Sequence, residues 1–432
     1  MKKTVVILYT KGMYDTVAND ICNYMTKKYP DCDVVAIDED RYSNLKSAQF
    51  VRNTYIFTAR NMAWLNRLAV LVREKFLPKK IDKTVKPYTQ ELKEENPTRN
   101  YRQKFHKVDN IFMRFVPEVV ICLSPKAHNK AILAKQRLAM NDVKVYALIT
   151  DFSLNKAYIN YQSDGYFVQN EAIKQALMAN KVDEQKISVC GTLIDEERLK
   201  DVTTAEAKEK LGIENDLPTV TISGGRYGVS YVKDTFDTLA PYTDRLNLVV
   251  LTGGSASIEK FVLTYCKAKN YNKNIIVVKG NADMNVIYAA TDVMVCSPTT
   301  VTLYEVFAKN IPCVLIRSLN NNERGNHTFL AEEQLAMRGG KDEQLATAVL
   351  GFINNNNIKQ EYLYNQRKFF DAKAIDGFAK AVYKESCAIN KARADAKAKD
   401  AAEVESKEKP AEEKDVKEKS NGNTRRNVQA KR

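Results

Sequence analysis

The sequence has few of the residues that build disulfide frameworks and metal centres. Its 432 residues include eight cysteines, scattered singly with no C-x-x-C pair, and only three histidines. Isolated cysteines argue against a structural zinc site and favour a reducing compartment. The scarcity of histidine argues against histidine-based metal chemistry. We therefore expect no bound metal.

Long apolar runs are also missing. No stretch approaches the roughly 18 apolar residues that a membrane-spanning helix needs. The start, MKKTVVILYTKG, resembles a secretory signal, but its apolar core is short, is broken by Lys11 and has no small-residue cleavage site. We interpret it as a first buried strand of a protein that is soluble or lies on a membrane surface.

The chain carries a large net positive charge. Lysine and arginine number 67 against 53 acidic residues, giving a formal net charge of +14. This excess favours anionic partners such as nucleic acid, an acidic lipid surface or a phosphorylated ligand, although it could also serve solubility alone. No motif that combines aromatic and basic residues for nucleic-acid recognition is present, so we expect no nucleic-acid partner.

Short β-rich apolar runs alternate with stretches of helical periodicity along most of the chain. The runs include residues 4–10, 118–123, 143–150, 219–225, 247–254, 292–297 and 312–317. Continuous apolar strands separated by helices predict parallel sheets covered on both faces. The chain length suits two such domains. The fold class is therefore α/β, with a first Rossmann-like domain at 1–194 and a second at 195–365.

The C-terminal part has a different composition. Residues 366–389 have helical periodicity, whereas residues 390–432 are rich in alanine, lysine and glutamate with almost no apolar side chains. Such a segment cannot bury enough surface to fold alone. We expect a helix at 366–389 and a charged disordered tail, or a solvated helix, at 390–432.

One region of the first domain departs from the alternating pattern. Residues 60–107 interleave basic side chains, among them Lys79, Lys80 and Lys83, with apolar ones, and they contain Trp64, the only tryptophan. A basic apolar helix of this kind is typical of an element that lies on an anionic membrane. The alternative is a core helix with a solvated basic face.

The stretch SPTTVTLYEVFAKNIPCVLI, residues 297–316, joins two predicted strands through a helix. Thr299 and Thr300 stand where the helix begins, so their amides and the helix dipole favour a phosphate there. Thr302 adds a hydroxyl, and Glu305 lies on the same face. A carboxylate repels phosphate, so a neutral ribose diol is its natural partner. The alternative is an ordinary helix cap with a solvated Glu305.

Three further polar turns follow predicted strands of the second domain. The turns at 223–230 and 252–257 are rich in glycine, which lets a backbone approach a ligand closely. The turn at 320–330 contains Glu323 and Asn326, which suit sugar hydroxyls. Together these turns predict a ligand site beyond the carboxyl ends of the strands.

The ordered motifs carry a family resemblance. PTTVTLYEVFAKNIP at 298–312, NNNERGNH at 320–327 and TDF at 150–152 resemble the motifs of GT-B glycosyltransferases. The sequence is most similar to the group of monogalactosyldiacylglycerol synthase and processive diacylglycerol glucosyltransferase, relatives of the N-acetylglucosaminyltransferase that acts on lipid-linked peptidoglycan precursors. The resemblance implies the GT-B fold, in which a cleft separates an N-terminal acceptor domain that faces the membrane from a C-terminal nucleotide-sugar domain.

The resemblance also implies a role for each donor-side residue. The donor is a UDP-sugar, used without a further cofactor or metal. Backbone at Asn281 and Ala282 would face the uracil, and Glu305 would bind the ribose. The diphosphate would be held by Thr299 and Thr300 together with Gly224 and Gly225, and the sugar by Asn322, Glu323 and Asn326.

The acceptor half departs from the family pattern. Three histidines of the family are absent: the sequence has Gly12-Met13-Tyr14, Ser124-Pro125 and TDFSLNKAY at the corresponding turns. Inverting transfer needs a base within hydrogen-bond reach of the acceptor hydroxyl. Asp151 is the first candidate and Asp15 the second, because both follow predicted strands. The alternative role for Asp151 is to cap the next segment.

These observations lead to competing functions. The first is a hexosyltransferase, inverting and metal-independent, that acts on a diacylglycerol-like lipid at the inner face of the cell membrane. The second is a catalytically impaired UDP-sugar-binding scaffold or regulator, favoured by the missing histidines. A nucleotide-sugar epimerase on the same fold is a third, weaker option.

Overall fold

The computed structural model describes residues 2–39, 108–225, 231–269, 274–280, 282–318 and 321–424. Two six-stranded sheets dominate it, and every strand pair in them is parallel. The predicted α/β class with two Rossmann-like domains is confirmed. The predicted boundary between residues 194 and 195 falls between the last strand of the first sheet and the first strand of the second.

The first sheet has the strand order β2-β1-β3-β4-β5-β6. Its strands are β1 (Lys3–Tyr9), β2 (Cys32–Asp38), β3 (Val119–Cys122), β4 (Lys144–Ile149), β5 (Gly165–Val168) and β6 (Ile187–Val189). Ile7 of β1 is paired with Ala36 of β2 and with Ile121 of β3. All four residues of β3 are buried, because helices cover both faces of the sheet.

The second sheet has the order β12-β11-β10-β7-β8-β9. Its strands are β7 (Thr219–Ser223), β8 (Asn247–Leu251), β9 (Ile275–Val278), β10 (Val293–Cys296), β11 (Cys313–Leu315) and β12 (Met337–Arg338). The central strands β7, β8 and β10 are buried along their whole length. Their sequences, TVTIS, NLVVL and VMVC, are accordingly apolar or β-branched rather than alternating.

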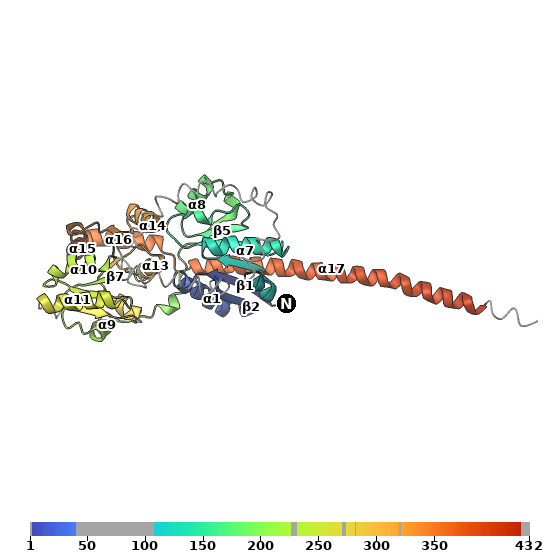
Figure 1. The fold of residues 1–432 in the computed structure, drawn as a ribbon, viewed down its shortest axis with the longest axis horizontal. Helices are drawn as coiled ribbons and strands as arrows, with labels where there is room; N and C mark the ends of the chain where they lie inside the picture. Colours follow the sequence, from blue (N-terminus) through green and yellow to red (C-terminus); the bar gives the residue numbers. More distant parts are fainter. Residues whose placement is uncertain are drawn as a thin grey trace, which may run out of the picture.

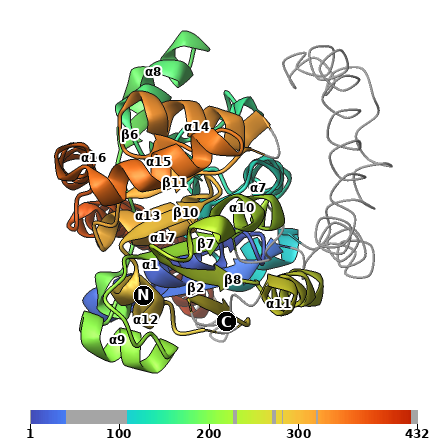
Figure 2. The ribbon, with the colours of Figure 1, turned by 90° about the vertical axis from the view of Figure 1, so that its left-hand side faces the viewer.

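Helices pack on both faces of each sheet (Figures 1 and 2). The first domain has α1 (Asp15–Lys28), α7 (Pro125–Arg137) and α8 (Glu171–Ala179). The second has α9 (Thr204–Leu211), α10 (Val232–Leu239), α11 (Ala256–Lys269), α12 (Met284–Ala290), α13 (Thr300–Ala308), α14 (Asn321–Glu332), α15 (Glu343–Asn354) and α16 (Asn356–Phe369). Short 3₁₀ turns occur at Lys156–Tyr158, Glu184–Lys186, Glu196–Arg198 and Ala240–Tyr242.

The last helix, α17 (Ala374–Thr424), returns to the first domain and then projects away from it (Figure 1). The ring of Tyr383 stacks on Tyr29 with 4.0 Å between centroids. Arg393 donates to the buried carboxylate of Glu118 at 3.0 Å and to the carbonyl of Pro117 at 2.9 Å. These contacts fix the first part of the helix on the N-terminal sheet.

The helix departs from the predicted segmentation. It starts at Ala374 rather than at 366, and it continues through residue 390, where the sequence predicts the start of a tail, as far as Thr424. Alanine, lysine and glutamate are strong helix formers, so this composition permits a helix without a buried face. From 394 to 403 every residue is exposed, as expected for a solvated helix.

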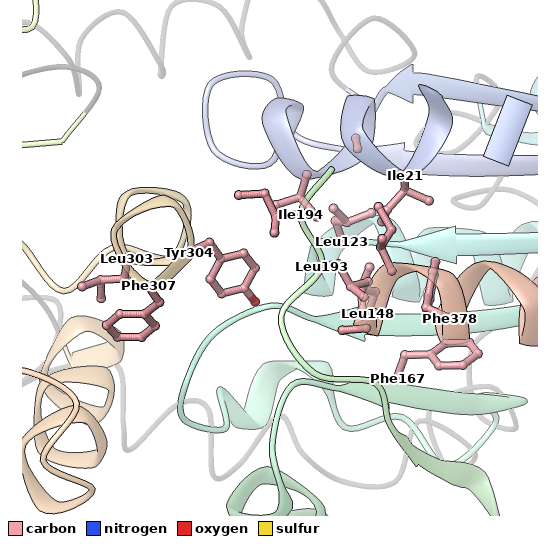
Figure 3. Close-up of a cluster of buried hydrophobic side chains, with 14 of the residues drawn as sticks. Ile21, Leu123, Leu148, Phe167, Leu193, Ile194, Leu303, Tyr304, Phe307 and Phe378 are labelled. Carbon is pink, nitrogen blue, oxygen red and sulfur yellow. The ribbon is translucent and has the colours of Figure 1, made fainter. Parts of the chain in front are cut away.

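A hydrophobic core joins the two domains (Figure 3). It combines Ile21, Leu123 and Leu148 of the first domain with residues of α13 and with Phe378 of α17. At its centre Phe152, just after β4, meets four aromatic rings of the C-terminal half at centroid distances of 5.9 to 6.3 Å. These rings belong to Tyr304, Phe307, Phe329 and Phe369. The domains are therefore held together by apolar packing as well as by polar contacts.

Several predicted features lie wholly or partly outside the described residues. They are the basic apolar region at 60–107, residues 226–230 of the turn at 223–230, Asn281, the first residue of the turn at 320–330 and the end of the tail at 425–432. Across the described part of the chain, no helix is both long and apolar enough to cross a membrane.

Candidate active site

The start of α13 and the end of β7 meet at the carboxyl edge of the second sheet. Gly225 follows β7 with a φ of +76°, a conformation that favours glycine. A Cβ atom added there would lie 3.6 Å from the Ser297 hydroxyl and 3.9 Å from the Thr299 hydroxyl. The structure thus brings together Gly225 and Thr299, as the sequence predicts for a diphosphate site.

Ser297 is a member of this group that the sequence reasoning did not single out. Its side chain is fully buried, and its hydroxyl has no hydrogen-bond partner among the residues that the structure describes. In this structure the Thr299 amide donates to the Ser297 carbonyl at 2.7 Å, so binding a phosphate through this amide would require that bond to break. Thr300 is the first residue of α13, so its amide lies in the positively polarised first turn. An anion there would meet the Thr300 amide and the Ser297 hydroxyl.

Glu305 lies at the junction between the two domains. Its carboxylate is 8% exposed and accepts a hydrogen bond from Arg198 at 2.6 Å and one from the Tyr288 hydroxyl. Burial raises the pKa of Tyr288 well above its usual value, and the Glu305 charge raises it further, so the phenol stays protonated and donates. Glu305 is therefore held in place by two donors rather than being a solvated surface carboxylate.

Asp151 faces the second domain from the end of β4. It is 6% exposed, and three donors of the second domain bond to it: Thr300 Oγ1 at 3.2 Å, Asn322 Nδ2 at 2.9 Å and Asn326 Nδ2 at 3.2 Å. The predicted base thus touches three residues predicted to bind the donor.

Asn326 connects the domains through both ends of its amide. Its oxygen accepts from the backbone amides of Phe152 at 3.0 Å and Ser153 at 3.1 Å, and its nitrogen also donates to the Pro298 carbonyl at 3.2 Å. Gly325 permits this approach, because a Cβ atom there would lie 2.3 Å from the Ser153 hydroxyl. In this arrangement Asn326 holds the two domains together.

The turn after β1 lies on the acceptor side. Burial raises the pKa of the Tyr14 phenol, and the negative charge of Asp151 raises this pKa further. Tyr14 and the predicted base Asp151 are therefore close enough to interact. Glu39, after β2, is buried and accepts from Thr10 at 2.5 Å and Ser124 at 2.9 Å. Asp15 accepts from the Gly12 amide at 3.0 Å and begins α1.

The comparisons with known proteins fit this architecture. Residues 15–194 match the family model described as monogalactosyldiacylglycerol (MGDG) synthase. Among solved structures, the chain is similar to MurG of Acinetobacter baumannii, with 13% identity, a TM-score of 0.55 and coverage of 88% of this chain and 99% of that one. The chain has the GT-B fold. Its predicted resemblance to the GT-B glycosyltransferase group is confirmed.

This GT-B chain is also similar to two proteins of Staphylococcus aureus. It is 12% identical to S. aureus MnaA, solved with UDP, with a TM-score of 0.57 and coverage of 87% and 94%. A processive diacylglycerol beta-glucosyltransferase of Staphylococcus aureus (strain JH9) is 21% identical over 252 residues, 58% of this chain. The chain spans 63% of the length of that relative.

The other residues predicted to bind the donor also lie in the second domain. Gly224 is buried directly after β7, and Thr302 is half-buried on α13. Ala282 packs against a buried cluster that contains Ile213, Leu251 and Ile287. Glu323 lies in the first turn of α14.

One cavity lies away from the predicted donor site. It has a volume of about 410 Å³ and is lined by Lys200, Asn285, Lys309 and Pro312, among others. Thr291 and Pro312, which also line it, precede β10 and β11, so it opens at the amino ends of these strands. Ligands of open α/β sheets bind at the opposite edge. We therefore do not assign the donor to this cavity.

Proposed function

We propose that this protein is a glycosyltransferase that transfers a hexose from a UDP-sugar to a hydroxyl of a diacylglycerol-like membrane lipid. One observation carries the proposal: Asp151, from the domain that matches the MGDG synthase model, contacts the first turn of α13 and the first two turns of α14 in the other domain. An acceptor-side carboxylate is thereby placed beside the residues predicted to hold the donor. The Staphylococcus relative is a diacylglycerol glucosyltransferase, which supports the same acceptor class.

The donor would lie across the carboxyl edge of the second sheet. Its diphosphate would occupy the start of α13, beside Gly225 and the Ser297 hydroxyl, which has no hydrogen-bond partner within the described parts of the chain. The helix terminus would stabilise the negative charge that develops on the leaving diphosphate, so the proposal requires no metal. Glu305 would accept from the ribose hydroxyls.

The transfer itself would be an inverting displacement. The acceptor oxygen forms a bond to the anomeric carbon while the bond between that carbon and the diphosphate oxygen breaks. Asp151 takes the proton of the acceptor hydroxyl, and UDP leaves with the electron pair. For this step one of the three donors now bonded to Asp151 must yield its place to the acceptor hydroxyl, which a small movement of α14 would allow.

The donor half of the proposal predicts a defined effect of Glu305→Gln. A neutral amide accepts the ribose hydroxyls less strongly than a carboxylate, so UDP binding should weaken by about 1–3 kcal/mol, or roughly 5- to 150-fold in Kd. Isothermal calorimetry measures both proteins. Glu259→Gln, a carboxylate of α11 that pairs with exposed Lys279, is the matched control and should bind UDP normally. Equal affinities of wild type and Glu305→Gln would remove Glu305 from the site.

The membrane half of the proposal rests on the sequence of residues 60–107. We propose peripheral binding to the anionic inner face of the cell membrane, where each cation near the surface contributes about 1 kcal/mol and salt screens it. Flotation with anionic liposomes should fall with added salt and in the triple replacement of Lys79, Lys80 and Lys83 by glutamate. The same replacement of the exposed Lys260, Lys267 and Lys341 is the control. Unchanged flotation of the first triple variant would refute this assignment.

A further inference from the structure

Arg198 lies in the segment that links the two domains. It pairs with two buried carboxylates, one in each domain. It ends the 3₁₀ turn Glu196–Arg198, between the last strand of the first sheet and α9. Its Nε atom lies 2.8 Å from the carboxylate of Asp20 on α1, and its Nη1 atom lies 2.6 Å from Glu305 on α13. Asp20 is only 4% exposed. The guanidinium therefore bridges the two domains.

The position of Glu305 depends on this bridge. A carboxylate has about four acceptor positions, and Arg198 and Tyr288 occupy one on each oxygen. Two positions remain, which is the number that a pair of adjacent hydroxyls requires. The guanidinium is a planar fork that keeps its geometry when it bonds to two partners. It therefore fixes the direction in which the unused positions of Glu305 point.

We propose that Arg198 is a positioning residue that orients Glu305 for the ribose diol of the donor nucleotide. The inference rests on the proposed function, because it assumes that Glu305 meets the ribose. Without Arg198, Glu305 would lose its orientation, and two buried carboxylates, Glu305 and Asp20, would lose their shared cation. The nucleotide site would then no longer recognise the two hydroxyls as a pair.

A ribose-specific measurement separates positioning from a merely structural role. Calorimetry compares UDP with 2′,3′-dideoxyuridine diphosphate, which lacks the diol. We expect the wild type to prefer UDP by at least about 100-fold, as two hydrogen bonds to a charged group imply. In Arg198→Met this preference should fall to less than about threefold, while the affinity for the dideoxy compound changes little.

Arg393→Met is the matched control. Arg393 also pairs with a buried carboxylate, Glu118, but it does so where α17 packs on the first domain. Its loss should lower stability without changing the preference for UDP. Because Arg198→Met could fail to fold, Arg198→Lys is measured as well. A lysine keeps the charge but lacks the fork, and the preference should fall several-fold.

Each result of these binding measurements leads to a different conclusion. Full preference for UDP in Arg198→Met, or in Arg198→Lys when the methionine variant does not fold, would overturn the positioning role and leave the proposed function intact. A wild type that binds UDP and the dideoxy compound equally would overturn the role of Glu305, and with it that of Arg198. A wild type that binds no UDP would overturn both this inference and the proposed function.

Discussion

Replacing Phe152 by alanine is expected to lower the free energy of unfolding by about 3–5 kcal/mol. The ring is fully buried and contacts four aromatic rings of the second half of the chain. Its loss leaves a cavity at the point where the two domains pack together. Urea unfolding followed by circular dichroism measures the change.

Phe236→Ala is the matched control for this prediction. Phe236 is equally buried, but its core cluster belongs to the second domain alone. Both variants should lose stability, whereas only Phe152→Ala should separate the unfolding curve into two transitions, one for each domain. A loss below about 1 kcal/mol, or a single transition in both variants, would contradict a joint core centred on Phe152.

Asp151→Asn is expected to lower turnover by about 10²- to 10⁴-fold, the usual effect of losing a general base. The amide cannot take a proton from the acceptor hydroxyl. Asparagine has nearly the same shape and can still accept from Asn322 or Thr300, so UDP affinity should stay within about twofold of the wild type. Single-turnover measurements with excess enzyme give the rate of the chemical step.

Asp15→Asn serves as the comparison. Asp15 begins α1 and accepts from the Gly12 amide, so its replacement should affect the rate far less. A fully active Asp151→Asn would place the base elsewhere, and Asp15 would then be the next residue to test.

The sequence predicted the sheets well, because strands that are buried on both faces are apolar throughout. Runs such as 293-VMVC-296 and 247-NLVVL-251 become strands of the second sheet. The start of α13 after Pro298 was predicted for a similar reason, since its threonines and the preceding strand are local signals. Local patterns of this kind need no knowledge of the tertiary structure.

The contacts between the domains could not be predicted in the same way. Arg198 lies 178 residues from Asp20 and 107 from Glu305, and nothing in its local sequence indicates either partner. The motif TDF drew attention to Asp151, but the burial of Phe152 among four rings depends on how the domains pack. The amide of Thr299 was expected to be available, and a local turn to the Ser297 carbonyl occupies it.

The central claim is sugar transfer to a lipid, and one measurement tests it most directly. Full-length protein is incubated with a radiolabelled UDP-hexose, either UDP-glucose or UDP-galactose, and vesicles that contain diacylglycerol and anionic phospholipid, and the lipid fraction is separated and counted. We expect labelled lipid to form with one of the two donors, in amounts equal to the UDP released, and much less with Asp151→Asn. A wild-type protein that binds the UDP-sugar but yields no labelled lipid with either donor would contradict the account, and would favour a UDP-sugar-binding protein without transferase activity.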